Sequence, residues 1–177
     1  MHHEIEIKIL DIDSVKIKEK LLKIGAKDLG EKFLREITFD YPTKSKQKIK
    51  TMLRLRTEGK KTFLTYKERN EVDEFLDVNE YETEVGDDNT ILTIFEKIGL
   101  NKRNFREKTR HSFKLDNVNI EIDKYPTIPA YMELEGDRKT IEKTLSLLGY
   151  KISDGCNLVA SQVLQKYGED PSNQMFD

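Results

Sequence analysis

Short segments in which apolar and charged residues alternate strictly recur along this chain, and they constrain its fold more than any other feature. Successive side chains of a β-strand point to opposite faces, so each segment predicts one apolar and one charged face. The first is Glu4–Ile9, in which Ile5, Ile7 and Ile9 are apolar. Seven more predicted strands are Arg35–Tyr41, Met52–Arg56, Thr62–Glu68, Asn79–Val85, Asn104–Leu115, Val118–Tyr125 and Ala130–Gly136. Eight strands, mostly joined by short turns, predict an antiparallel sheet or barrel.

Four helical segments separate or follow these strands. Asp13–Ile24, Asp88–Ile98 and Asp137–Leu148 carry apolar residues at helical spacing and end before a glycine. A weaker pattern predicts a last helix over Asn157–Tyr167. We therefore expect one α+β domain, residues 1–177, with helices added to the sheet.

The second face of the predicted strands is almost entirely ionisable. Its residues are Glu4, Glu6 and Lys8; Arg54 and Arg56; Lys67; Glu80, Glu82 and Glu84; Arg106, Lys108 and Arg110; Glu121 and Asp123; and Glu133 and Glu135. An open sheet with one face in water explains such alternation. A sheet closed into a tunnel would enclose the charges, which would then need metal cations and anions as partners. Mg²⁺ or Mn²⁺ with a polyphosphate supplies both, but alternation alone does not distinguish the tunnel from the open sheet.

The composition argues against several classes of protein. The 177 residues include 31 Lys and Arg against 33 Asp and Glu, and this balance disfavours a nucleic-acid binder. Cys156 is the only cysteine, which excludes an intrachain disulfide, and we expect it to be a small core residue. Neither a signal peptide nor a membrane-spanning stretch is evident, so we expect a cytoplasmic protein with no membrane partner. His2 and His3 receive no role, and His111, with outward parity, is expected to pack against a helix.

In chain order, the strand motifs resemble the signature of the CYTH superfamily, the triphosphate tunnel metalloenzymes. The first strand, Glu4-Ile5-Glu6-Ile7-Lys8, has the E-x-E-x-K pattern of this family. The motifs that follow are Phe39-Asp40-Tyr41-Pro42, Leu53-Arg54-Leu55-Arg56, Leu64-Thr65-Tyr66-Lys67, Glu80-Tyr81-Glu82-Thr83-Glu84, Lys108-Thr109-Arg110, Glu121-Ile122-Asp123 and Met132-Glu133-Leu134-Glu135-Gly136. The resemblance covers about residues 1–150 and is greatest to the branch of class IV adenylyl cyclases and thiamine triphosphatases. It implies an eight-stranded antiparallel closed β-tunnel with a charged interior and helices packed on the outside.

The resemblance also implies roles for individual residues. The ligands of one or two Mg²⁺ or Mn²⁺ ions would be Glu4, Glu6, Asp123, Glu133 and Glu135. The residues that bind the triphosphate would be Lys8, Arg54, Arg56, Lys67, Lys108 and Arg110. Glu82 and Glu84 would be partners of those cations or weak metal ligands. No side chain is assigned as nucleophile, so we expect the metal to activate it.

Two reactions are compatible with such a site: hydrolysis of a triphosphate, and cyclisation of ATP to cAMP with release of pyrophosphate. The substrate would be ATP, thiamine triphosphate or inorganic tripolyphosphate, bound by a monomer or homodimer. A non-catalytic sensor of polyphosphate or nucleotide is the alternative within the family. A protein-interaction domain with an open charged sheet is the alternative outside it.

Overall fold

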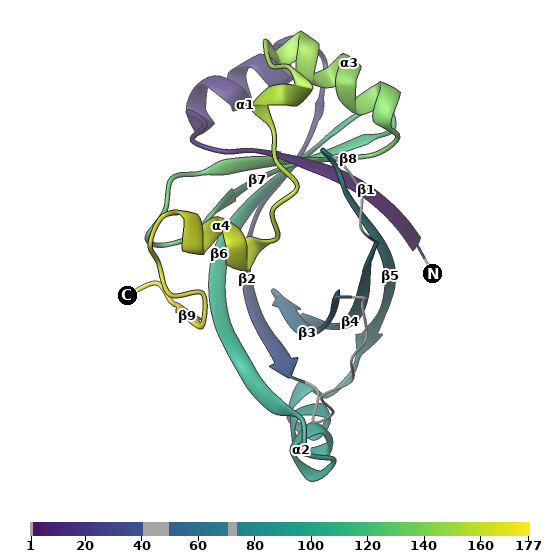
Figure 1. The fold of residues 1–177 in the computed structure, drawn as a ribbon, viewed down its shortest axis with the longest axis vertical. Helices are drawn as coiled ribbons and strands as arrows, with labels where there is room; N and C mark the ends of the chain where they lie inside the picture. The colour runs from purple at the N-terminus through teal and green to yellow at the C-terminus, as the bar shows by residue number, and fades with distance from the viewer. Residues whose placement is uncertain (1, 41–49, 71–73) are drawn as a thin grey trace.

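The computed structural model describes residues 2–40, 50–70 and 74–177, and a closed β-barrel forms its centre (Figure 1). The strands are β1 (His2–Ile9), β2 (Lys27–Asp40), β3 (Lys50–Glu58), β4 (Lys61–Asn70), β5 (Leu76–Val85), β6 (Asn101–Leu115), β7 (Val118–Lys124), β8 (Tyr131–Glu135) and β9 (Asn173–Gln174). The first eight follow the order β2-β3-β4-β5-β1-β8-β7-β6, and β2 pairs with β6 to close the ring. All their pairings are antiparallel, so the predicted eight-stranded tunnel is confirmed. The short β9 adds to β6 in parallel.

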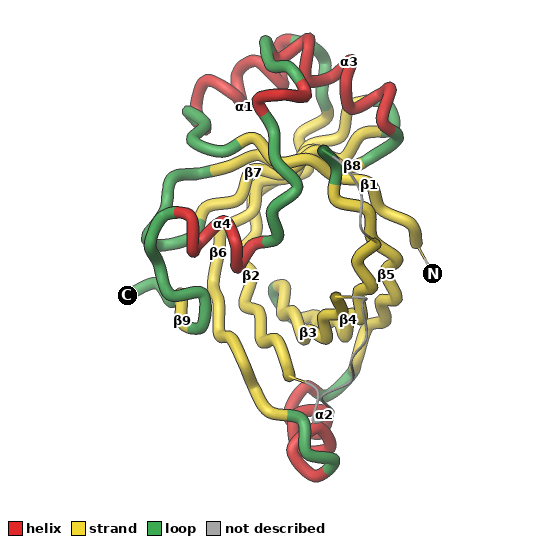
Figure 2. Tube along the Cα trace, viewed as in Figure 1, coloured by secondary structure: helices red, strands yellow, loops and turns green. Residues whose placement is uncertain are grey.

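Helices lie outside the ring of strands (Figure 2). They are α1 (Ser14–Lys23), α2 (Asp88–Lys97), α3 (Arg138–Leu148) and α4 (Ala160–Lys166), with a short 3₁₀ turn over Ile152–Asp154. Asp13, Asp87 and Asp137 cap the first three helices by accepting a hydrogen bond from a backbone N–H in the first turn. The predicted boundaries of α1, α2 and α3 are correct to within one residue. Within the described residues, no helix is both long enough and apolar enough to cross a membrane.

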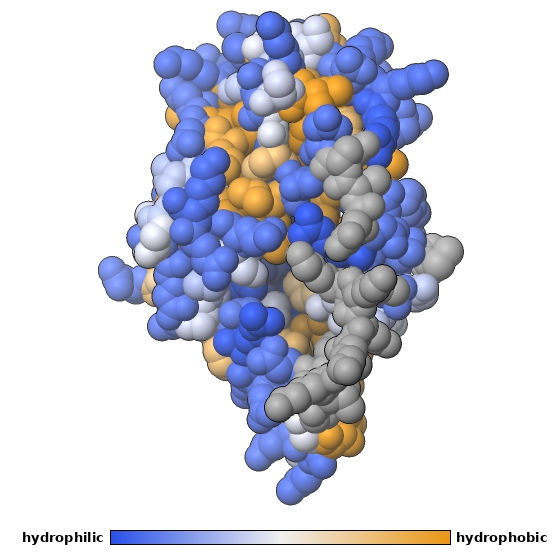
Figure 3. All heavy atoms as spheres, viewed as in Figure 1, coloured by the Kyte–Doolittle hydropathy of each residue, from blue (hydrophilic) through white to orange (hydrophobic). Residues whose placement is uncertain are grey.

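The apolar positions of the strands face outward and form the core beneath the helices. Ile120 and Leu134 of the barrel and Leu145 of α3 are fully buried in one cluster. At the other end of the barrel, the rings of Phe39 and Phe95 meet edge to face with centroids 4.9 Å apart. The face drawn in Figure 3 is mostly hydrophilic, with apolar side chains gathered between α3 and α4. Because the outward positions are apolar, the alternate, charged positions point into the barrel.

The C-terminal segment departs from its prediction. α4 is shorter than the expected Asn157–Tyr167, and the residues before it are extended. Cys156 is half-buried, and its backbone exchanges two hydrogen bonds of 2.9 Å with that of Lys8. Cys156 can pair with Lys8 because β5 pairs with β1 only as far as Glu6. The next backbone groups of β1 therefore need another hydrogen-bond partner.

Three further expectations are modified. β2 begins at Lys27 rather than Arg35, and a bulge follows Asp28. His111 faces outward as expected, but its partners are Asp28 of β2, at 2.8 Å, and the stacked ring of Phe113 rather than a helix. Tyr81 and Phe105 belong to the apolar faces of the predicted strands Asn79–Val85 and Asn104–Leu115, yet both remain exposed. Tyr41 and Pro42 of the second strand motif lie outside the described residues.

Candidate active site

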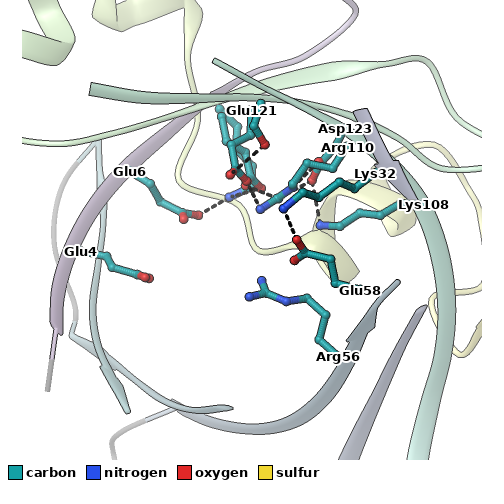
Figure 4. A network of polar contacts seen from close by, with 12 residues as sticks. Glu4, Glu6, Lys32, Arg56, Glu58, Lys108, Arg110, Glu121 and Asp123 are labelled. Carbon is teal, nitrogen blue, oxygen red and sulfur yellow. Dashed lines mark hydrogen bonds and ion pairs between the residues drawn. The ribbon is translucent and has the colours of Figure 1, made fainter. Parts of the chain in front are cut away.

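The charged strand faces line a cavity of about 650 Å³ inside the barrel. This volume is typical of small-molecule sites. Ten of the predicted site residues line it: Glu4, Glu6, Lys8, Arg54, Arg56, Lys67, Lys108, Arg110, Glu133 and Glu135. Figure 4 shows Glu4 and Glu6 pointing inward from one side and Arg56 from the other. The ionisable face is therefore enclosed, as the tunnel prediction requires.

Charges of opposite sign occupy opposite halves of this cavity. Among the described lining residues, the half made by β6, β2, β3 and β4, here the basic half, contributes eight cations and one carboxylate: Arg103, Arg106, Lys108, Arg110, Arg54, Arg56, Lys67 and Arg69, with Glu36. The half made by β5, β1, β8 and β7, the acidic half, contributes six carboxylates and one cation: Glu80, Glu4, Glu6, Glu133, Glu135 and Glu121, with Lys8. Strands of like sign are neighbours around the ring, so the cavity is polarised across its width.

Two buried carboxylates hold the basic half in place. Glu36 accepts a hydrogen bond from Nη1 of Arg54 at 3.1 Å and lies 3.8 Å from Nζ of Lys108. Asp123 accepts from Nζ of Lys108 at 2.7 Å, and from Nε and Nη2 of Arg110 at 2.6 Å each. The side chain of Asp123 has no exposed surface and does not line the cavity. It therefore lies behind the two cations that it orients.

Two lysines each bridge a pair of carboxylates on the acidic half. The contacts are Lys8 Nζ with Glu6 and with Glu133 Oε1 (3.3 Å), and Lys67 Nζ with Oε2 of Glu4 and of Glu80 (2.6 Å each). An ammonium group is a compact charge on a flexible stem, so it can leave such a position more readily than a guanidinium fork. Lysines that a ligand can displace thus neutralise Glu4, Glu6 and Glu80, whereas Glu133 also contacts the guanidinium group of Arg110 at 2.8 Å.

Glu4 and Glu135 offer a candidate position for a metal ion. One carboxylate oxygen of each lies within 4.8 Å of the other and of a ring nitrogen of His2. Nε2 of His2 is 3.5 Å from Oε1 of Glu135. Carboxylate oxygens are the donors that Mg²⁺ and Mn²⁺ prefer, and imidazole also suits transition metals. The chemistry of this donor set therefore fits a divalent cation.

The surroundings move carboxylate pKa values in opposite directions on the acidic half. Burial disfavours ionisation of Glu133, but Lys8 and Arg110 outweigh it and hold the pKa of Glu133 well below its ordinary value. Burial also opposes ionisation of Glu4, and there it outweighs Lys67, so the pKa of Glu4 is raised. Because a metal ligand must be deprotonated, a cation bound at Glu4 would compete with this proton.

Three predicted residues do not line the cavity. Asp123, predicted as a metal ligand, lies behind Lys108 and Arg110, which occupy its carboxylate. The other two are Glu82 and Glu84.

Glu82 accepts from Nη2 of Arg56 at 3.2 Å and from Oγ1 of Thr65 at 2.7 Å. Glu84 is exposed and pairs at 2.8 Å with Lys61, which is also exposed. Glu82 therefore contacts a cation of the basic half, whereas Glu84 does not.

Some lining residues were not assigned a role by the sequence. Arg106, Glu80 and Glu121 belong to the predicted charged face, and the family motifs gave them no function. Glu36 has inward parity within the predicted strand Arg35–Tyr41. This alternation could have identified it as a residue that lines the cavity. The C-terminal lining residues carry no formal charge, so no sequence pattern indicated that they line the site. They are Val159, Ala160, Ser161, Gln162 and Gln165.

Barrel and lining together define a protein whose strands enclose a cavity with a basic and an acidic half. The family model described as "CYTH domain" matches residues 2–152. The chain therefore belongs to the CYTH domain family, as the strand motifs predicted.

Individual relatives agree with this assignment. A protein of Methanocaldococcus jannaschii named "Putative adenylate cyclase" is 29% identical over 133 residues, which are 75% of each chain. A protein structure from Pyrococcus horikoshii has a TM-score of 0.78 at 25% identity and covers 90% of this chain and 98% of its own. The Hippeastrum "putative adenylyl cyclase HpAC1", described as having a dominant triphosphatase activity, has a TM-score of 0.64 at 18% identity, with coverages of 94% and 96%. At that identity, the Hippeastrum match shows the fold alone.

Proposed function

We propose that this protein is a metal-dependent enzyme that acts on an organic triphosphate, either by hydrolysis or by cyclisation of ATP to cAMP with release of pyrophosphate. The observation that supports this proposal is the division of the cavity into a basic and an acidic half. A triphosphate complexed with Mg²⁺ or Mn²⁺ presents negative charge to one half and positive charge to the other. A metal ion alone would complement the charge of the acidic half only, and a polyphosphate alone that of the basic half only.

In this proposal the phosphates bind to the basic half. Arg54 and Arg56 line the cavity, and the Nε atom of each has no hydrogen-bond partner among the described residues. Guanidinium groups with free donors can bind phosphate oxygens in pairs. Lys108 and Arg110 would add two more cations, held in position by Asp123. Phosphoryl transfer depends mainly on such positioning and charge neutralisation.

The acidic half would hold one or two metal ions through Glu4, Glu6, Glu133 and Glu135. When bound, Mg²⁺ or Mn²⁺ supplies neutralisation of phosphate charge and lowers the pKa of the attacking water or ribose hydroxyl. Lys8, released from its carboxylates, would turn to a phosphate oxygen. Binding thus exchanges ion pairs within the protein for ion pairs with the ligand.

Uncharged side chains in the cavity wall favour an organic triphosphate over inorganic tripolyphosphate. They are Phe39, Met52, Leu76, Val78 and the C-terminal residues Val159, Ala160, Ser161, Gln162 and Gln165. Apolar and amide groups of this kind suit a ring system such as a nucleobase or thiamine. Inorganic tripolyphosphate would leave them without a partner.

Product analysis tests this proposal. The purified protein is incubated with Mg²⁺ or Mn²⁺ and, separately, with ATP, other nucleoside triphosphates, thiamine triphosphate and tripolyphosphate, and products are resolved by chromatography. We expect metal-dependent turnover of an organic triphosphate, in which cAMP with pyrophosphate identifies a cyclase and release of phosphate identifies a hydrolase. Turnover of tripolyphosphate alone would identify the inorganic enzyme instead. Tight binding of a triphosphate without any product would identify the sensor and overturn the catalytic proposal.

A further inference from the structure

Arg106 differs from the other buried cations of the tunnel. Lys8, Arg54 and Lys108 each have a carboxylate oxygen within 4 Å: Glu133 at 3.3 Å, Glu36 at 3.1 Å and Asp123 at 2.7 Å, respectively. Arg106 is only 3% exposed and lines the cavity, yet no ion pair joins it to any residue that the structure describes.

Its contacts are neutral. The amide of Asn104, oriented to satisfy its neighbours, accepts hydrogen bonds from Nη2 of Arg106 at 3.1 Å and from Oγ1 of Thr38 at 2.5 Å, and donates to the carbonyl of Pro171 at 3.2 Å. Nε of Arg106 is buried and has no hydrogen-bond partner within the described part of the chain. These contacts orient the guanidinium group without giving it a carboxylate in direct contact, and its Nε donor remains free among the described residues.

A buried charge without a counter-ion in direct contact is costly, so such a group indicates an anion that binds there. Glu36 lies opposite Arg106 on β2 and attracts it electrostatically, but the Glu36 oxygens lie within 4 Å of Arg54 and Lys108 rather than of Arg106. A phosphate that reaches Arg54 or Lys108 must compete with a carboxylate already in place. A phosphate that reaches Arg106 displaces none.

We propose that Arg106, oriented by Asn104, is the anchor of an anion subsite that binds a phosphate group of the substrate before any metal ion is present. This proposal rests on the proposed function, since the anion is taken to belong to the triphosphate. It adds a phosphate-binding residue outside the family motifs. It also assigns the order of binding: phosphate can bind at Arg106 first, while lysines still occupy the carboxylates of the acidic half.

Isothermal titration of the metal-free protein in EDTA with tripolyphosphate tests the subsite. We expect wild-type protein to bind, Arg106→Gln to bind about tenfold to a hundredfold more weakly, and Arg106→Lys to retain part of the affinity. Arg35→Gln is the matched control, because Arg35 lies on the same pair of strands but is exposed outside the barrel and pairs with Glu107. Its affinity for tripolyphosphate should be unchanged.

Melting of the ligand-free variants supplies a second measurement. Arg106→Gln should melt at or above the wild-type temperature, because it removes a buried charge without separating an ion pair. Lys108→Gln should melt lower, because it leaves Asp123 with one partner fewer.

Each outcome decides between the proposals. Equal affinity of Arg106→Gln and wild type, or a fall in melting temperature as large as that of Lys108→Gln, would overturn the anchor at Arg106. Wild-type binding that appears only when metal is added would overturn the order of binding and leave the proposed function standing. Absence of binding with or without metal would overturn both.

Discussion

The basic and acidic halves of the tunnel are held together in different ways. The cations of the basic half contact two carboxylates that are almost fully buried, Glu36 and Asp123. On the acidic half, carboxylates are more exposed, and lysines bridge two pairs of them from the cavity side, while Arg110 contacts Glu121 and Glu133. Each half also contains one charge of the opposite sign, Glu36 in the basic half and Lys8 in the acidic half.

This difference separates a preorganised surface from an exchangeable one. Charges fixed before the ligand arrives need little reorganisation, as transition-state stabilisation requires. Flexible ammonium groups that occupy carboxylates can be displaced by a metal ion, at the cost of their existing contacts. We therefore expect substitutions on the two halves to differ in kind, with phosphate affinity changing on one and metal dependence on the other.

The largest effect is expected from the acidic half. Glu133→Ala combined with Glu135→Ala should reduce metal-dependent turnover at least a hundredfold, because charge stabilisation at the reacting phosphate is lost. The melting temperature should fall only by a few degrees, since Lys8 keeps Glu6 and Arg110 keeps Asp123 as partners. Initial rates across a metal titration measure the first effect.

The control for that experiment is Glu96→Ala combined with Glu142→Ala, two exposed carboxylates on α2 and α3. Control turnover should match that of wild type. Normal metal-dependent turnover in the Glu133 and Glu135 variant would show that the last strand holds no catalytic metal.

An intermediate effect is expected from the basic half. Arg56→Ala should lower kcat/KM roughly tenfold to 150-fold, because a charge-assisted contact to phosphate is lost. This corresponds to about 1.5–3 kcal/mol of transition-state stabilisation. Metal affinity in the absence of substrate should hold or rise, since a repelling cation has gone. Kinetics alongside Mn²⁺ titration separate the two quantities, with Arg35→Ala as the external control. Unchanged kinetics in the Arg56 variant would place its side chain outside the substrate site.

The smallest effect is a change in acid stability. Burial opposes ionisation of Glu36, but Lys108 and Arg54 outweigh it and hold the pKa of Glu36 far below its ordinary value of 4.5. Its contribution to stability is thus present above the unfolded pKa and is lost as the pH falls toward the folded pKa. Glu36→Gln should cost about 1–3 kcal/mol near neutral pH, and this difference from wild type should shrink below pH 4.5.

Urea unfolding at a series of pH values measures that difference. The exposed Glu19→Gln is the control and should follow wild type throughout. A difference between Glu36→Gln and wild type that stays constant down to the most acidic condition would mean that Glu36 does not titrate with its cations.

The inward and outward faces of the strands were predictable because successive side chains of a β-strand must point to opposite faces. Once Ile120 and Leu134 are buried under the helices, Glu121 and Glu133 must face the interior. Closure of the ring was not predictable from alternation, since it depends on β2 pairing with β6 across a long stretch of chain. It followed from the order of the family motifs.

Which cation pairs with which carboxylate inside the tunnel could not be predicted from the sequence. Asp123 and Glu133 have the same parity and similar motifs, yet one lies behind the wall and the other lines the cavity. Which cation each carboxylate meets is decided by register across strands that are distant in sequence. The isolation of Arg106 is of the same kind, because it depends on Glu36 being paired with Arg54.

The central claim is that metal and triphosphate bind to opposite halves and assist one another, and a thermal-shift matrix tests it most directly. The protein is melted alone, with Mg²⁺, with a non-hydrolysable triphosphate, and with both, at free-metal concentrations corrected for chelation. At a hundredfold excess over the dissociation constant, joint binding adds about 2.7 kcal/mol, or roughly 5–10 °C for a chain of this size. We predict a joint shift larger than the sum of the separate shifts, and a smaller one with pyrophosphate. Additive shifts, or none under any condition, would contradict the account.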